Sequence, residues 1–268
     1  MQQLFSRPAA LVALVAVFLL GPARTARAQT WGNIKGQVVW GEANIPKMGN
    51  ANVDKDKDHC LSKGAIPLND LIINSKNKGV KYVLVYLQDV KDAKSTKFAP
   101  AVHPSYKDPK KQVEVDQPCC SFEPRLLALR VGQELVVKNP ATIVHNFSIT
   151  SGTTGGPNLN QTIPAGGKLV IKGFVNKVIP TQYSCTVHTW MKGYVASFGH
   201  PYFAVTDADG NFEIKNAPTG KFRLVFWHEK AGWVVMNPKN PSDRGQVVKV
   251  EANKTLTLKP VKLTLPKD

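Results

Sequence analysis

The 268-residue chain is poor in acidic residues, in cysteine and in long apolar stretches. It has 19 Asp and Glu against 35 Lys and Arg, which gives a formal net charge of +16. No long apolar stretch follows residue 28, so the sequence predicts no transmembrane segment in the mature chain. The Gly-rich stretch Ser151–Gly156 is not followed by Gly-Lys-Ser, Gly-Lys-Thr or a helix signal, which excludes a phosphate-binding loop.

Residues 1–28 have the pattern of a secretory signal peptide. Arg7 precedes an apolar run from Ala9 to Leu20, which is too short to span a bilayer, and Ala26-Arg27-Ala28 offers small residues for cleavage. This segment contains three arginines and no acids, so its removal leaves 240 residues with a net charge of +13. We therefore expect a periplasmic or secreted protein with one large or two ordinary domains.

The remaining sequence favours an all-β fold, because short apolar segments bounded by turn residues recur along it. Ile34–Trp40 and Val80–Leu87 alternate like half-buried strands, while the charged run Asn52–His59 is interpreted as a solvated loop and Lys91–Lys111 as a linker or long surface loop. Further strands are predicted within Arg125–Gly132, Glu134–Lys138, Phe147–Ile149, Lys168–Ile171 and Thr181–Ser184. Their rhythm is typical of a Greek-key β-sandwich.

The stretch Tyr183–Val195 contains a thiol, an imidazole and a thioether at regular spacing. Cys185, His188 and Met191 are each three residues apart, so a tight turn after a strand could direct all three side chains at one point. A thiolate and a thioether select copper over magnesium or calcium, and Cys and His with a weak axial Met are ligands of electron-transfer copper centres. Zinc fits less well, because a thioether is a poor substitute for its usual ligands.

One more imidazole is needed, and His145 is the candidate, at the start of a strand that follows a turn. The pair His145-Asn146 followed by Cys-x2-His-x2-Met resembles the cupredoxins, or small blue copper proteins, and its short ligand loop is most similar to the amicyanin subtype rather than to plastocyanin. The resemblance covers residues 113–198. It implies one mononuclear type 1 copper, and a dinuclear site would need a cysteine where this chain has Thr181.

The resemblance also implies a role for each residue of the site. Met191 would be the long axial ligand, and Asn146 would tie the two ligand-bearing loops together. His188 would be the solvent-exposed ligand, and the electron would enter and leave through it, with Trp190 beside it.

The last third of the chain resembles the carboxypeptidase regulatory-like, or transthyretin-like, β-sandwich. The resemblance rests on Thr-Asp-x-Asp-Gly-x-Phe ending at Phe212 and on Pro-x-Gly-x-Phe ending at Phe222, and Gly36-Gln-Val38 and Val83-Leu-Val85 fit the first half of such a domain. We therefore expect a discontinuous domain with the copper module inserted into it. Its parts are residues 29–112, which include a linker, and 199–268, with the copper domain at 113–198.

Three cysteines remain besides Cys185. Exported proteins usually oxidise spare thiols, and the adjacent Cys119 and Cys120 could bridge each other only with strain. One of them is therefore expected to pair with Cys60. Cys120 is favoured because it shares a strand face with Phe122, and pairing with Cys119 stays open.

The function that follows is exported one-electron transfer by a type 1 copper protein. The resemblance implies a redox partner such as a c-type cytochrome or a periplasmic dehydrogenase, and the basic charge favours an acidic surface on it. No nucleic acid is expected, because the lysines are scattered and the chain is exported. A copper reservoir or an envelope structural protein is the alternative. Oxidase or reductase activity is not expected, because the chain has no His-x-His and no visible acid–base set.

Overall fold

The computed structural model describes residues 29–235 and 243–266, and the predicted signal segment 1–28 lies outside them. The prediction of an all-β fold is confirmed: the described chain forms four sheets. The helical elements of the described residues are α1 (Lys57–Cys60), η1 (Pro104–Tyr106) and η2 (Gly152–Thr154). No helix of this part of the chain is long and apolar enough to cross a membrane.

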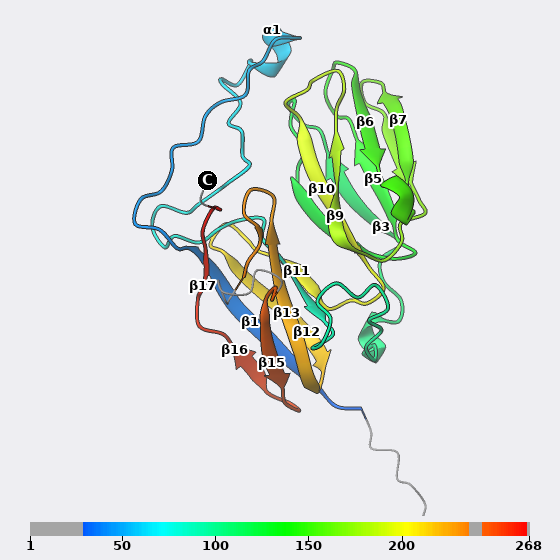
Figure 1. The fold of residues 1–268 in the computed structure, drawn as a ribbon. Coiled ribbons are helices and arrows are strands. Elements are labelled where there is room, and N and C mark those ends of the chain that lie inside the picture. The colour runs from blue at the N-terminus through cyan, green and yellow to red at the C-terminus, as the bar shows by residue number, and fades with distance from the viewer. Residues whose placement is uncertain (1–28, 236–242, 267–268) are drawn as a thin grey trace, which may run out of the picture.

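Two of the sheets form what we call the outer sandwich, drawn mainly in blue, orange and red in Figure 1. One layer contains β1 (Trp31–Trp40), β12 (Asn211–Pro218), β16 (Thr255–Thr257) and β17 (Val261–Leu263). The other contains β2 (Leu84–Gln88), β11 (Phe203–Val205), β13 (Gly220–His228), β14 (Gly232–Trp233) and β15 (Gln246–Val250). Strand β1 pairs antiparallel with β12 and parallel with β16 and β17, so the two ends of the described chain share one sheet.

The intervening residues 112–198 form a second pair of sheets, the inner sandwich, drawn in green and yellow-green in Figure 1. Its larger sheet contains β4 (Leu126–Arg130), β10 (Lys192–Phe198), β9 (Lys177–Ser184), β6 (His145–Thr150) and β7 (Asn158–Ile163), in that order. Its smaller sheet contains β3 (Gln112–Asp116), β5 (Glu134–Lys138) and β8 (Lys168–Ile171). A core rich in Phe, Leu, Ile and Val lies between these two layers.

The two sandwiches share an apolar junction formed by β2 and β13 of the outer one and β4 and β10 of the inner one. Successive residues of a strand point to opposite faces. In β2, Leu84 and Tyr86 therefore face the junction, while Val85 and Leu87 face the outer core. The prediction of a half-buried strand was wrong here, because a covering layer lies on each face and residues 82–88 are all buried.

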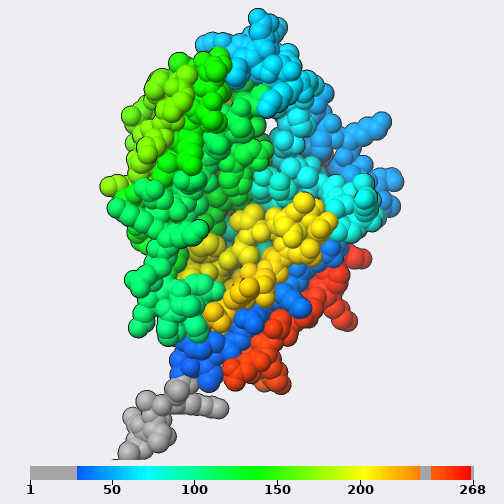
Figure 2. All heavy atoms as spheres, turned by 180° about the vertical axis from the view of Figure 1, so that it is seen from behind, coloured from blue at the N-terminus to red at the C-terminus, as the bar shows by residue number. Residues whose placement is uncertain are grey.

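The connection from β1 to β2 leaves the outer sandwich and reaches the inner one. Residues 49–68, which we call the cap segment, fold back on themselves: the Ala51 N–H donates to the Ile66 carbonyl at 2.8 Å, and the Leu68 N–H donates to Gly49 at 3.1 Å. Figure 2 shows this part of the chain, in light blue, lying against the green inner sandwich. A disulfide joins Cys60 of the cap segment to Cys120.

Candidate metal centre

The four predicted ligands lie at one end of the inner sandwich. His145 begins β6, while Cys185, His188 and Met191 occupy the connection from β9 to β10, and all four are at most 1% exposed. The connection is tight: the Cys185 N–H donates to the Met191 carbonyl at 3.1 Å, and the Met191 N–H donates to His188 at 2.9 Å. This turn brings the side chains of Cys185 and His188 close to each other.

Three donor groups converge closely. Nδ1 of His188 lies 2.9 Å from Nδ1 of His145 and 3.8 Å from the sulfur of Cys185. Donor atoms of the three residues lie within 4.8 Å of one another. Two imidazole nitrogens with lone pairs and one thiolate around a common point match the soft ligand set that copper prefers. The three side chains therefore fit a bound metal ion.

The sulfur of Cys185 accepts hydrogen bonds from two backbone N–H groups, those of Asn146 and His188, each at 3.4 Å. Burial raises the pKa of the Cys185 thiol, but hydrogen bonds from His145, His188 and these two amides outweigh burial and lower the pKa to about 5. The site therefore stabilises the thiolate, the form that binds metals. Burial lowers the pKa of His188, and its bonds to Cys185 and Asp56 outweigh this effect and raise it.

Asn146 joins the strand that carries His145 to the turn that carries Cys185. Its side-chain oxygen accepts from the Thr186 N–H at 2.6 Å, and its amide nitrogen donates to the Thr186 hydroxyl at 2.6 Å and to Asn160. The Gln117 side chain donates to the Asn146 carbonyl at 3.2 Å. This is the tie that the resemblance implied for Asn146.

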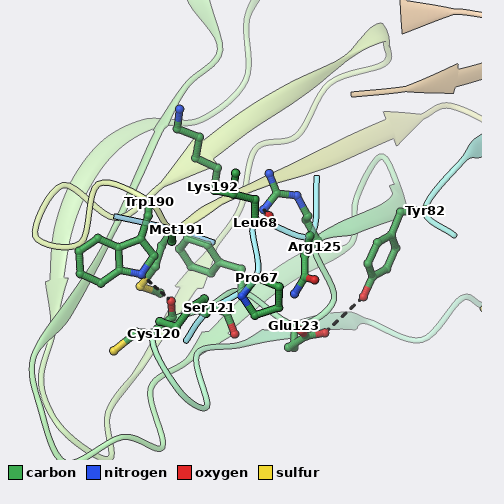
Figure 3. A pocket seen from close by; sticks show the side chains of 14 residues that line it. Pro67, Leu68, Tyr82, Cys120, Ser121, Glu123, Arg125, Trp190, Met191 and Lys192 are labelled. Atoms are coloured by element: carbon green, nitrogen blue, oxygen red, sulfur yellow. Dashed lines mark hydrogen bonds between the residues drawn. The ribbon is translucent and has the colours of Figure 1, made fainter. Parts of the chain in front are cut away.

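Met191 is packed in the same apolar core as Cys185. It lines a narrow crevice between the cap segment and the β9–β10 connection, where Cys120, Trp190 and Lys192 also lie (Figure 3). The interior of this crevice is about 20 Å³, room for a single water molecule rather than for an organic substrate.

The expected solvent exposure of His188 was wrong, since this side chain is 0% exposed. The cap segment covers it: Nε2 of His188 lies 2.8 Å from a carboxylate oxygen of Asp56. The charged run Asn52–His59 is thus only partly a solvated loop, because Val53 is buried in the inner core and Asp56 contacts a predicted ligand.

Trp190, the other residue predicted to lie on the electron path, connects His188 to the protein surface. Its ring centroid is 5.2 Å from that of His188, its indole N–H donates to the Cys120 carbonyl at 3.1 Å, and the residue is half-buried. The carbonyl of Cys120 thus holds the indole in place. Cys120 also forms the disulfide with Cys60, and both sulfurs lie within 4.8 Å of a ring nitrogen of His188.

The sequence reasoning missed Asp56, because a carboxylate in a run of alternating lysines and aspartates gives no sign of a buried partner. The available signal was the disulfide. Pairing Cys60 with Cys120 brings the segment before Cys60 next to the end of the inner sandwich that carries the ligands. Cys119 is half-buried with a free thiol.

No protein-family model matches this chain, and no curated protein matches it. Among solved structures, a cuprous amicyanin variant is 19% identical, with 37% of this chain and 93% of that chain covered and a TM-score of 0.30. A purple cupredoxin from Nitrosopumilus maritimus is 18% identical over 31% of this chain and 97% of that chain, with a TM-score of 0.27. A copper-containing nitrite reductase from Thermus scotoductus is 17% identical over 39% of this chain but 26% of that chain, with a TM-score of 0.30.

Proposed function

We propose that this chain is an exported type 1 copper protein that carries single electrons between redox partners. The observation that carries the proposal is the convergence of Nδ1 of His145, Nδ1 of His188 and the sulfur of Cys185 in a buried site. Met191, buried in the same core, would be the weak axial ligand. When bound, copper would supply a one-electron change between its cuprous and cupric states.

The residues of the chain hold the donors in place. His145 is held in the β6 ladder, and the sheet pairs β6 with β9, the strand that leads into Cys185. A Cβ on Gly193 would clash with the Tyr183 ring, so glycine lets this ring of β9 lie across β10 close to the turn. Ligand positions fixed by the sheets favour electron transfer, because little has to move when the charge of the site changes.

The first test is the optical spectrum of the copper-loaded protein. We expect an intense visible thiolate-to-copper band in the wild-type protein and none in Cys185→Ser, while Cys119→Ser keeps the band because Cys119 contributes no donor to the cluster. A coloured Cys185→Ser protein would contradict the assignment. Bound copper without a thiolate band would point to a different metal site.

A copper reservoir is the second candidate, and the burial of His188 under the cap segment favours it. A carrier exchanges electrons rapidly, whereas a reservoir holds cuprous copper without cycling. Stopped-flow mixing of the reduced protein with an oxidised c-type cytochrome separates the two. Electron transfer on the millisecond scale supports the carrier, and tight cuprous binding without transfer supports the reservoir.

The remaining features of the proposal concern location and partners. The predicted signal peptide supports a periplasmic or secreted location, and the net charge of +13 left after its removal supports an acidic partner such as a c-type cytochrome or periplasmic dehydrogenase. We propose that the protein does not convert a substrate. The narrow crevice beside Met191 supports this, because it has no room for an organic molecule next to the donor cluster. The outer sandwich, by its sequence motifs, would be a transthyretin-like domain that carries the copper domain.

A further inference from the structure

Asp56 and His188 are 132 residues apart in sequence and come from different parts of the fold. A carboxylate oxygen of Asp56 lies 2.8 Å from Nε2 of His188, the ring nitrogen that does not face His145 and Cys185. The Asp56 side chain is 38% exposed and the His188 side chain 0%. The carboxylate therefore sits between solvent and the buried imidazole.

Two anchors hold the cap segment, and with it Asp56, against the inner sandwich. Val53 is 8% exposed and packs in the inner core. Cys60 is bonded to Cys120, which lies in the same core. Asp56 stands between an apolar anchor three residues before it and a covalent anchor four residues after it, so its position depends on both.

The backbone of Asp56 is itself specialised. It adopts a left-handed conformation with φ 49° and ψ 41°, which non-glycine residues rarely adopt although Asp tolerates it better than most. Its carbonyl accepts the Cys60 N–H at 2.9 Å and the His59 N–H at 3.1 Å, so this residue is the N-cap of α1. Such conformations persist where the surrounding structure holds them, and they cluster at functional sites.

An imidazole whose Nε2–H donates a hydrogen bond to a carboxylate leaves Nδ1 as the nitrogen that can bind a metal ion. In His188, Nδ1 is the ring nitrogen that faces Cys185 and His145, so it is the atom placed to bind a metal ion. A carboxylate on the far nitrogen of a metal-bound His also fixes the ring orientation and makes the ligand more basic. We infer that Asp56 is a positioning residue that holds His188 ready for the metal, and that the Cys60–Cys120 disulfide keeps Asp56 in that position.

This inference rests on the proposed metal binding at His145, Cys185 and His188, but part of it can be tested without metal. In the metal-free protein, nitrogen NMR of His188 reports which ring nitrogen carries the proton. We expect a hydrogen-bonded Nε2–H in the wild-type protein, and a change of its chemical shift in Asp56→Ala because the accepting carboxylate is gone. An unchanged His188 spectrum in Asp56→Ala would overturn the inference whether or not the protein binds copper.

The metal-bound test uses cobalt(II) and copper(II), each titrated against a competing chelator. We expect Asp56→Ala to weaken binding of both ions by about 10- to 100-fold, the usual effect of removing a hydrogen-bond partner of a metal ligand. Asp56→Asn should lose less, because its amide oxygen still accepts from Nε2. Asp58→Ala is the matched control: this exposed acid lies in the same segment and should keep wild-type affinity.

The outcomes separate the two proposals. Wild-type affinity in Asp56→Ala would overturn the positioning role while leaving the metal site intact. A wild-type protein that binds neither ion would contradict the proposed function instead. The NMR experiment on the metal-free protein would then be the test of the role of Asp56.

The role of the disulfide is tested by a double-mutant cycle between Asp56→Ala and the pair Cys60→Ser with Cys120→Ser. If the disulfide acts through Asp56, removing it should weaken metal binding, and adding Asp56→Ala should then change little. Fully additive losses would overturn this part. Cys119→Ser is the control for loss of a thiol, and should bind as the wild-type protein does.

Discussion

Arg125 and Glu229 form a two-point ion pair where the two sandwiches meet. The Arg125 Nη2 donates to Glu229 Oε2 at 2.7 Å and Nε donates to the other carboxylate oxygen, and both side chains are nearly buried, at 12% and 11% exposure. Arg125 also donates to the Leu68 carbonyl at 3.1 Å, at the end of the cap segment. One guanidinium thus joins the inner sandwich, the outer sandwich and the cap segment.

Removing the Glu229 carboxylate should therefore destabilise the protein strongly. Glu229→Ala leaves a nearly buried guanidinium without its partner, and we expect the free energy of unfolding to fall by about 3–5 kcal/mol in urea titrations. Glu251→Ala is the control, because this carboxylate is exposed where it meets Lys249 and Lys254, so its loss should change stability far less than the loss of Glu229. Equal losses in the two variants would contradict the importance of the junction.

Met191→Leu tests axial ligation. Leucine has nearly the volume of methionine, so the change should cost less than about 1.5 kcal/mol of stability although the residue is 1% exposed. Loss of a weak sulfur donor should keep the visible colour and raise the reduction potential, because the donor favours the cupric state. Redox titration followed by absorbance measures the potential, and an unchanged value would count against axial coordination by Met191.

Asn146→Ala should loosen the link between the two ligand-bearing segments. It removes the bonds to the Thr186 amide and hydroxyl and to Asn160, and we expect a loss of about 1–3 kcal/mol of stability together with weaker metal binding. Asn160→Ala keeps both bonds to Thr186 and should lose less. If both variants retain wild-type stability and affinity, the hydrogen bonds of Asn146 do not hold the site together.

Two histidines outside the metal site predict a loss of stability in acid. Burial lowers the pKa of His200 and of His228 to about 4, against an ordinary value of 6.5. Between pH 6.5 and 4 the unfolded chain therefore binds more protons than the native one, so stability is present above this window and falls as the pH drops through it. The loss should approach about 3 kcal/mol for each residue at the lower end.

Chemical unfolding at a series of pH values measures this effect. A His200→Gln, His228→Gln double variant should show a flatter decline of the unfolding free energy between pH 6.5 and 4 than the wild-type protein, whatever its stability at neutral pH. A decline of the same steepness would mean that these histidines do not control the acid response.

The approach of Cys185 to His188 was predictable because it is local: the two residues are three apart in one tight connection. His145 lies 40 residues before Cys185, and it was predicted because the donor set needs a second imidazole and this one opens a strand after a turn. The all-β class was predictable from the recurring short apolar segments.

The contacts between distant segments were not predictable in the same way. Nothing in Asn52–His59 shows that Asp56 meets His188, because that contact depends on how a long connection is folded back and covalently anchored. Likewise the alternation in Val80–Leu87 says nothing of a second covering layer. Strand β2 is buried on both faces because β4 and β10 pack against the side that the pattern left open.

The pairing of β1 with β12, β16 and β17 has a consequence for how the molecule is made. The strands that pair with β1 lie between residues 211 and 263, whereas β1 ends at Trp40, so translation must pass residue 211 before this strand can join its sheet. Contacts of such long sequence separation form slowly. The strands within residues 112–198 pair only with one another, so the inner sandwich does not depend on residues after 198. Strand β1, although it is made early, joins its sheet late.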